Sequence, residues 1–128
     1  FGIVACEIGY YDEAYTYCSQ SARMDLDDYH NNFYAGIHAA NMAGTWQAVV
    51  NGFAGLRTND GTLRFKPYLP EKWEGYQFCI GYQGSTLKVE IGRNGADFTL
   101  LEGKPAVFYV NGRACSIKEE GGTWHEEI

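Results

Sequence analysis

The spacing of hydrophobic residues changes once along the chain, near residue 60. Before that point, apolar residues recur every three to four positions, as on one face of a helix. After it, they alternate with polar residues, as in a half-buried strand. The sequence therefore predicts an α+β chain with its helices first and its strands afterwards.

The first part predicts helices joined by short connections. Residues 3–8 read as the last turns of a helix that ends at Gly9, a residue suited to the left-handed position after a helix. A second helix is expected from an N-cap at Asp12 to about Arg23. A third, from about residue 36 to residue 52, is apolar nearly all round, which indicates burial on every side. So few helices cannot bury that surface alone, and we expect more protein around them.

The second part predicts short strands joined by tight turns. Strict alternation marks residues 76–82 and 87–91 as strands. The pairs Asn94-Gly95 and Asn111-Gly112 are typical of two-residue hairpins, and Asn59-Asp60-Gly61 is a further turn signal. Short strands with regular turns favour an antiparallel sandwich.

Composition and charge exclude several classes of protein. A length of 128 residues with 45% hydrophobic residues excludes a disordered chain. The net charge of −6 argues against sequence-independent binding to nucleic acid, which needs a basic face. No apolar run approaches the ~20 residues of a membrane-spanning helix, so no membrane partner is expected. The chain starts without Met inside an apolar run, at Phe1, which suggests that it continues a longer protein.

Four cysteines are scattered without the spacing of metal ligands: Cys6, Cys18, Cys79 and Cys115. Each falls on an apolar periodic face, so we expect free buried thiols in a reducing, cytoplasmic compartment, with disulfides as the alternative. No metal site is expected.

His38 is the histidine with the most informative position. It falls in the expected first turn of the third helix, where unpaired N–H groups and the positive end of the helix dipole suit an anion. Asn41, three residues later, is expected to face the same way. The alternative is that His38 is a hydrogen-bonded core histidine and Asn41 a hydrogen bonder at the helix terminus. His125 lies in a polar tail and is expected to be exposed.

Three carboxylates lie close together after the second helix, namely Asp25, Asp27 and Asp28. Paired carboxylates can act as general acid and base, but three acids after a helix are more typical of a solvated connection or of ion pairs with neighbours such as Arg23. The aromatic residues offer a second alternative, a sugar-stacking surface around Trp73, against ordinary packing.

A series of ordered segments carries a family resemblance. They are Asp25-Leu-Asp-Asp-Tyr29, Gly36-Ile37-His38, Met42-Ala-Gly-Thr-Trp46, Gly52-Phe53-Ala-Gly55-Leu-Arg57, Phe65-Lys-Pro67-Tyr-Leu-Pro70-Glu-Lys-Trp73 and Phe78 to Gly84. In this order and spacing they resemble the C-terminal region of the glycoside hydrolase family 65 disaccharide phosphorylases, which act on maltose, trehalose, kojibiose or nigerose. The resemblance covers residues 1 to about 92.

The resemblance implies a fold for each part of the chain. Residues 1–57 would be the closing helices of an (α/α)6 catalytic barrel, and residues 58–75 a crossing segment. Residues 76–128 would form a small antiparallel β-sandwich as the C-terminal domain, with a first strand near residue 62 as the alternative start.

The resemblance also implies a reaction. Such enzymes cleave an α-glucosyl disaccharide with inorganic phosphate and inversion, which gives β-glucose 1-phosphate and a sugar. Phosphate is the co-substrate and no cofactor is implied. His38 matches the family's phosphate-contacting histidine, and Asn41 stands where many members have Ser. The catalytic glutamate would lie upstream, so this chain holds no catalytic residue and is expected to be inactive alone.

Two alternatives remain open at this point. One is a hydrolase of the same family, similar to acid trehalase, which activates water instead of phosphate. The other is a non-catalytic module that binds carbohydrate or another protein. For the phosphorylase, the expected partners are the disaccharide, phosphate, the missing N-terminal part of the same chain and a second copy in a homodimer.

Overall fold

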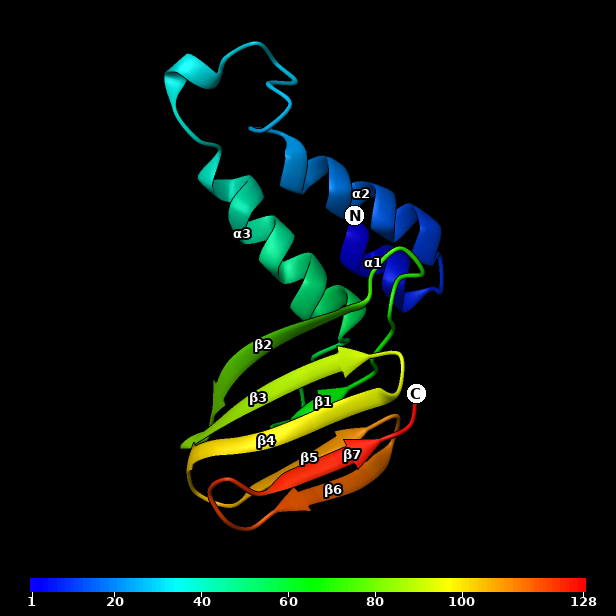
Figure 1. Ribbon diagram of the computed structural model, residues 1–128, viewed down its shortest axis with the longest axis vertical. Helices are drawn as coiled ribbons and strands as arrows, with labels where there is room; N and C mark the ends of the chain where they lie inside the picture. The colour runs from blue at the N-terminus through cyan, green and yellow to red at the C-terminus, as the bar shows by residue number, and fades with distance from the viewer. The chain divides into compact units, whose positions relative to one another are not determined.

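The computed structural model describes residues 1–128, apart from the side chain of Phe33. The chain divides into two compact units, Phe1–Phe53 and Ala54–Ile128, which we call the helical unit and the β unit. The prediction of an α+β chain is confirmed, because helices occupy the first unit and strands the second (Figure 1).

The helical unit contains five helical segments. They are α1 (Gly2–Glu7), α2 (Tyr11–Arg23), the 3-10 turn η1 (Phe33–Ala35), α3 (Ala39–Gln47) and the π-helix η2 (Ala48–Phe53). Gly9, at φ +83°, follows α1 in the left-handed conformation, as predicted. The predicted N-cap at Asp12 is wrong. The N–H of Ala14 already donates to the carbonyl of Tyr10 over 3.0 Å, so α2 begins one residue before Asp12.

The predicted helix over residues 36–52 is divided in the structure. Gly36 has φ +106°, which a right-handed helix does not accept, so this residue lies outside α3. His38 is the residue before the helix, with a non-helical ψ of 82°. Beyond Ala48 the backbone widens into η2, and a Cβ added at Gly52 would lie 3.3 Å from the Cys6 sulfur. Glycine therefore allows η2 to approach α1 closely.

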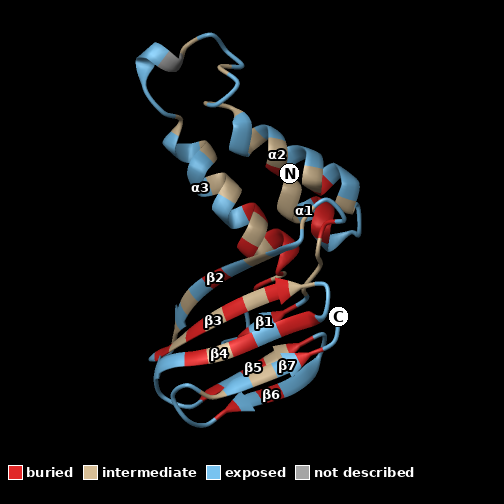
Figure 2. Cartoon of the chain, viewed as in Figure 1, coloured by how far each residue is buried: buried red, intermediate tan, exposed pale blue. Residues whose placement is uncertain are grey.

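The prediction that this helix is buried on every side is wrong for the chain as described. No described residue of α3 is buried, and Met42 and Trp46 are 58% and 51% exposed (Figure 2). Among the described residues of the helical unit, the large buried side chains are Val50 and Phe53, and both lie on η2. α1 and α2 therefore leave large apolar side chains of α3 exposed.

The β unit contains seven strands in two sheets. They are β1 (Arg64–Phe65), β2 (Gly75–Tyr82), β3 (Ser85–Gly92), β4 (Gly95–Gly103), β5 (Ala106–Val110), β6 (Arg113–Ile117) and β7 (Thr123–Glu126). One sheet has the order β1-β5-β6 and the other β2-β3-β4-β7. All neighbours are antiparallel except β1 and β5, which are parallel. The strands predicted from alternation and the hairpin at Asn111-Gly112 are confirmed. A hairpin also joins β3 to β4, but its turn residues are Arg93 and Asn94, because Gly95 already pairs with Gly92.

Three phenylalanines from both sheets form the centre of the β unit. The Phe98 ring of β4 lies 4.7 Å from the Phe108 ring of β5 and 5.1 Å from the Phe65 ring of β1, measured between centroids. All three side chains are buried. Trp73 meets Tyr76 edge-on, with ring centroids 5.8 Å apart, so its ring packs against a neighbouring aromatic side chain.

Two expectations for the β unit are corrected. His125 is not in a polar tail: it lies on β7, where its Nδ1 is 2.7 Å from Asp97 Oδ1 of the neighbouring β4. The alternation around it was missed because so many of its residues are polar. Cys79 is exposed on the outer face of β2, whereas Cys6, Cys18 and Cys115 are buried. None of the four described cysteines is in a disulfide, and burial raises the pKa of Cys18 and of Cys115.

Candidate functional site

The candidate site lies where the connection from α2 meets the start of α3. This connection runs from Met24 to His38 and passes through two non-glycine residues with positive φ, Asp28 at 45° and Asn31 at 52°. Left-handed backbone is uncommon outside glycine and is best tolerated by Asn and Asp. The connection is therefore a tight, specific fold, which brings side chains distant in sequence back to His38.

His38 is held by a carboxylate thirteen residues earlier. Its Nδ1 is hydrogen-bonded to Asp25 Oδ1, and its backbone N–H donates to Asp25 Oδ2 over 2.9 Å. The same carboxyl group thus binds both the ring and the main chain of one residue. Hydrogen bonds from the ring and then from the backbone N–H of His38 lower the pKa of Asp25, so it stays ionised at neutral pH.

Asn32 lies at the other ring nitrogen of His38. Its Nδ2 is 3.5 Å from His38 Nε2, a long contact at the limit of a hydrogen bond. The backbone N–H of Asn32 donates to Asp28 Oδ1 over 2.8 Å, which fixes this residue in the connection. The Nε2 side of the imidazole therefore faces an amide, and the Nδ1 side faces a carboxylate.

Asn41 has its side chain on α2 instead. The backbone N–H of Asn41 donates to the carbonyl of His38 over 2.9 Å, but its side-chain amide donates to the sulfur of Met24. The Asn41 carbonyl also accepts a hydrogen bond from Ser21 over 3.2 Å. The structure thus joins His38 and Asn41 through the main chain and gives their side chains different partners.

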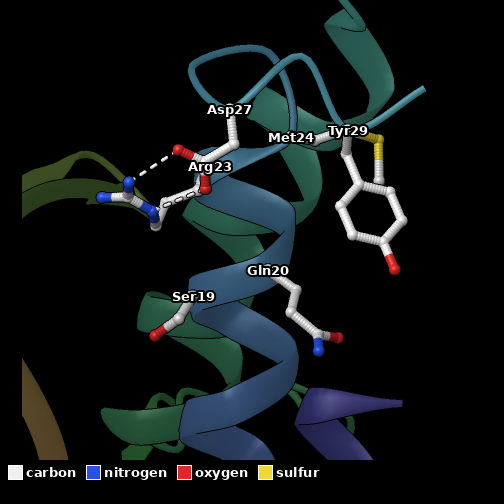
Figure 3. A pocket seen from close by; sticks show the side chains of 6 residues that line it. All are labelled: Ser19, Gln20, Arg23, Met24, Asp27 and Tyr29. Carbon is white, nitrogen blue, oxygen red and sulfur yellow. Dashed lines mark hydrogen bonds and ion pairs between the residues drawn. The ribbon is translucent and has the colours of Figure 1, made fainter. Parts of the chain in front are cut away.

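The neighbouring acid Asp27 belongs to a different pair. It accepts two hydrogen bonds from the Arg23 guanidinium, at 2.8 and 2.6 Å, and they raise the pKa of that guanidinium (Figure 3). The pair borders a cavity of about 270 Å³ at the end of α2, which is also lined by Ser19, Gln20, Met24 and Tyr29. Because Asp27 neutralises Arg23, this cavity is a poor site for an anion.

The three acids of the connection therefore have three separate partners. Asp25 binds His38, Asp27 binds Arg23 and Asp28 binds the backbone of Asn32. This arrangement favours the ion-pair interpretation over paired catalytic carboxylates. The Asp25–His38 pair was missed from the sequence, because a separation of thirteen residues matches no helical or strand period.

The site can act as a donor to an anion. A carboxylate only accepts hydrogen bonds, so the hydrogen of the pair lies on Nδ1 when Asp25 is ionised. A protonated imidazole then presents a second N–H at Nε2, next to the amide of Asn32 and at the N-terminus of α3. Among the described residues, no group of three or more His, Cys, Asp or Glu side chains is arranged to hold a metal ion. Nor has any described helix the length and apolar character to cross a membrane.

Comparisons with known families match both units. Residues 1–47 match the glycosyl hydrolase family 65 central catalytic domain, and residues 56–117 match the C-terminal domain of the same family.

Individual relatives agree with this match. The chain is 50% identical over 109 residues to an alpha,alpha-trehalose phosphorylase of Thermoanaerobacter brockii, covering 85% of this chain and 14% of the relative. It is 38% identical over 103 residues to a maltose phosphorylase of Bacillus subtilis, covering 80% and 14%. Among solved structures, a putative kojibiose phosphorylase from human microbiome matches 99% of this chain and 16% of its own, with a TM-score of 0.90 and 28% identity. The chain thus spans about one seventh of the length of these relatives.

Proposed function

Because the chain belongs to glycosyl hydrolase family 65, we propose that it is the C-terminal part of an inverting disaccharide phosphorylase. The observation that carries the proposal is His38, held by Asp25 at the start of α3, in a chain 50% identical to a trehalose phosphorylase over 109 residues. In this proposal the chain provides the phosphate-binding corner of the active site.

The proposed architecture extends beyond the described residues. Residues 1–57 would be the closing helices of an (α/α)6 barrel, and residues 76–128 the C-terminal domain after a crossing segment. The exposed apolar side chains of α3, Met42 and Trp46, would then face other helices of the ring. The other helices of such a barrel would bury these two side chains, which α1 and α2 leave exposed.

In the proposed reaction, His38 binds and orients phosphate. The Nε2–H of the imidazolium donates to a phosphate oxygen, and the N-terminus of α3 adds its positive dipole end. A carboxylic acid from another part of the enzyme protonates the oxygen of the glycosidic bond. Phosphate attacks the anomeric carbon from the opposite face, which gives β-glucose 1-phosphate and a free sugar. Phosphate is already a nucleophile, so the chain needs no cofactor.

Asn41 would provide a second donor. Its amide now donates to the sulfur of Met24, which is a weak acceptor. A charged phosphate oxygen is a much stronger acceptor, so a change of rotamer toward bound phosphate is favourable.

The test is an assay of the full-length enzyme on trehalose, maltose, kojibiose and nigerose, with and without phosphate. Trehalose comes first, because two trehalose phosphorylases are 50% and 42% identical to this chain. We expect release of glucose 1-phosphate that depends strictly on phosphate, with the β anomer identified by NMR. Release of glucose without phosphate would identify a hydrolase instead, and binding of sugar without turnover a non-catalytic module.

The role of His38 has its own test. His38→Ala is expected to raise the KM for phosphate at least about tenfold while the KM for the disaccharide changes little, because one charged hydrogen bond to phosphate is lost. His30→Ala is the matched control, since it removes an exposed histidine from the same connection. Equal changes in both KM values would return His38 to a structural role.

Two further proposals concern the whole protein. We propose a homodimer, which light scattering of the full-length enzyme would test against a monomer. We also propose a reducing, cytoplasmic location, in keeping with the absence of disulfides at the described cysteines Cys6, Cys18 and Cys115, and thiol titration of protein purified without reductant would test it.

A further inference from the structure

The carboxylate of Asp25 makes two hydrogen bonds to His38. The two residues are thirteen positions apart, so neither bond follows from a helical or strand period. One joins Oδ1 to the His38 ring at Nδ1, and the other joins Oδ2 to the His38 backbone N–H at 2.9 Å. A bond to the backbone fixes where the residue lies, and a bond to the ring fixes how the imidazole is turned. Together they define the direction of Nε2.

We propose that Asp25 is the positioning residue for phosphate binding: it holds the His38 imidazole with Nδ1 hydrogen-bonded and Nε2 directed at the phosphate. This inference rests on the proposed function of His38. Asp25 itself does not touch phosphate. It acts through the ring, as a carboxylate does behind a histidine that binds a metal or a substrate.

The chemistry of the pair explains why a carboxylate is needed. An ionised carboxylate accepts only, so it keeps a hydrogen on Nδ1 and leaves Nε2 as the nitrogen that meets the ligand. A phosphate oxygen without a hydrogen only accepts, so it is Nε2 that donates when the two meet. The imidazole ring separates the Asp25 carboxylate at Nδ1 from a phosphate bound at Nε2, so the two negative groups are kept apart.

The surroundings of the pair support this direction. The His38 and Asp25 side chains are 34% and 25% exposed, so the pair is partly shielded from water but open to a ligand. Asn32 Nδ2 lies 3.5 Å from Nε2, and the bond from Asn32 N–H to Asp28 Oδ1 holds it there. No anion fits between two nitrogens at this distance, so a phosphate that binds Nε2 would replace the long contact with Asn32.

The test uses the full-length enzyme with inorganic phosphate as the probe. Asp25→Asn is expected to raise the KM for phosphate at least about tenfold and to leave the KM for the disaccharide nearly unchanged. Asp25→Glu keeps the carboxylate and is expected to restore part of the phosphate affinity. Asp27→Asn is the matched control, because it removes an acid from the same connection that binds Arg23 instead.

A double variant separates positioning from general damage. If Asp25 acts through His38, then adding Asp25→Asn to His38→Ala raises the KM for phosphate no further, whereas independent effects multiply. Direct binding of phosphate by calorimetry gives the same comparison when turnover is too slow, and the melting temperature of each variant reports folding.

The outcomes distinguish this inference from the function on which it rests. If His38→Ala raises the KM for phosphate but Asp25→Asn does not, or if the two effects multiply, the positioning role is overturned and the function of His38 stands. If His38→Ala itself leaves the KM for phosphate unchanged, both are overturned.

Discussion

The two units bury their hydrophobic residues very differently. Among the described residues, the β unit provides 16 of the 23 buried hydrophobic residues, and the helical unit provides 11 of the 14 large hydrophobic side chains that stay exposed. The β unit closes its two sheets over a centre of phenylalanine rings. The helical unit buries mainly small residues, such as Ala14 and Cys18. The β unit contains its own core, whereas the helical unit leaves most of its large apolar side chains exposed.

The largest effect is expected when the two units are produced as separate proteins. Residues 54–128 are expected to give a monomer that unfolds cooperatively, because their core is complete. Residues 1–53 are expected to be largely unfolded or to aggregate, because their exposed apolar surface exceeds what three short helices cover. Circular dichroism with thermal melting, together with light scattering, measures both. A cooperative monomer from residues 1–53 would contradict the comparison.

Core truncation is expected to have the next largest effect. Phe98→Ala in the β unit removes a fully buried ring and is expected to cost about 3–5 kcal/mol of the free energy of unfolding. Met42→Ala on α3, where the side chain is 58% exposed, is expected to stay within about 0.5 kcal/mol. Urea unfolding of both variants tests the difference. A large cost for Met42→Ala in full-length protein alone would show that other parts of the enzyme cover α3.

Replacing glycines that have positive φ is expected to give a smaller difference in stability between the two units. Gly103, at φ +100°, has the Gly84 carbonyl oxygen where a Cβ would lie, so Gly103→Ala adds a clash to backbone strain. We expect a loss of about 2–5 kcal/mol there. Gly9, at φ +83°, has open space around it, so Gly9→Ala is expected to cost only the strain, about 1–2 kcal/mol. If both variants lose the same free energy of unfolding in denaturant, the backbone at Gly103 and Gly84 can move apart without cost.

The smallest effect is expected from the two histidine–aspartate pairs, in opposite pH ranges. The hydrogen bond to Asp97 raises the pKa of His125, so that pair stabilises the fold fully below about pH 6.5 and loses its effect as the pH rises through the folded pKa. The bonds from His38 lower the pKa of Asp25, so that pair stabilises the fold above about pH 3.9 and loses its effect as the pH falls through the folded pKa.

Melting temperatures across pH check both directions. The difference between the wild type and Asp97→Asn is expected to shrink from about pH 6 to pH 8. The difference for Asp25→Asn is expected to shrink as the pH falls below about 4, through the lowered folded pKa of Asp25. Identical pH dependence for the two variants would mean that the pairs do not titrate as their contacts indicate.

Local patterns predicted the β unit well. Alternation placed β2 and β3 because one face of each strand packs on the core, and the Asn111-Gly112 turn has positive φ at both residues, as its hairpin requires. The strand β7 was missed, because its polar residues hide the alternation. The parallel pairing of β1 with β5 was missed as well, because it joins segments far apart in the sequence.

Local patterns predicted less of the candidate site. His38 was identified, but the start of α3 was placed too early, because the conformation of Gly36 and the bond from the His38 N–H to Asp25 decide it. The partner of His38 was not predicted, since the fold of the connection brings Asp25 to it. The side-chain contact of Asn41 with Met24 likewise depends on how α2 and α3 meet.

The parallel pairing of β1 has a consequence for the order in which the chain folds. Phe65 pairs with Val110, so the first strand of the β unit finds its neighbour only after forty-five more residues have been synthesised. Contacts of such high contact order form slowly, because a long loop must close before they give any stability. During synthesis, the hairpins formed by β2, β3 and β4 can therefore fold early. Leu63 and Phe65 stay exposed to water until β5, in the last third of the unit, has been synthesised. Nascent chains that stop short of β5 are therefore expected to lack the strand on which β1 pairs and to be more prone to aggregate than the complete unit.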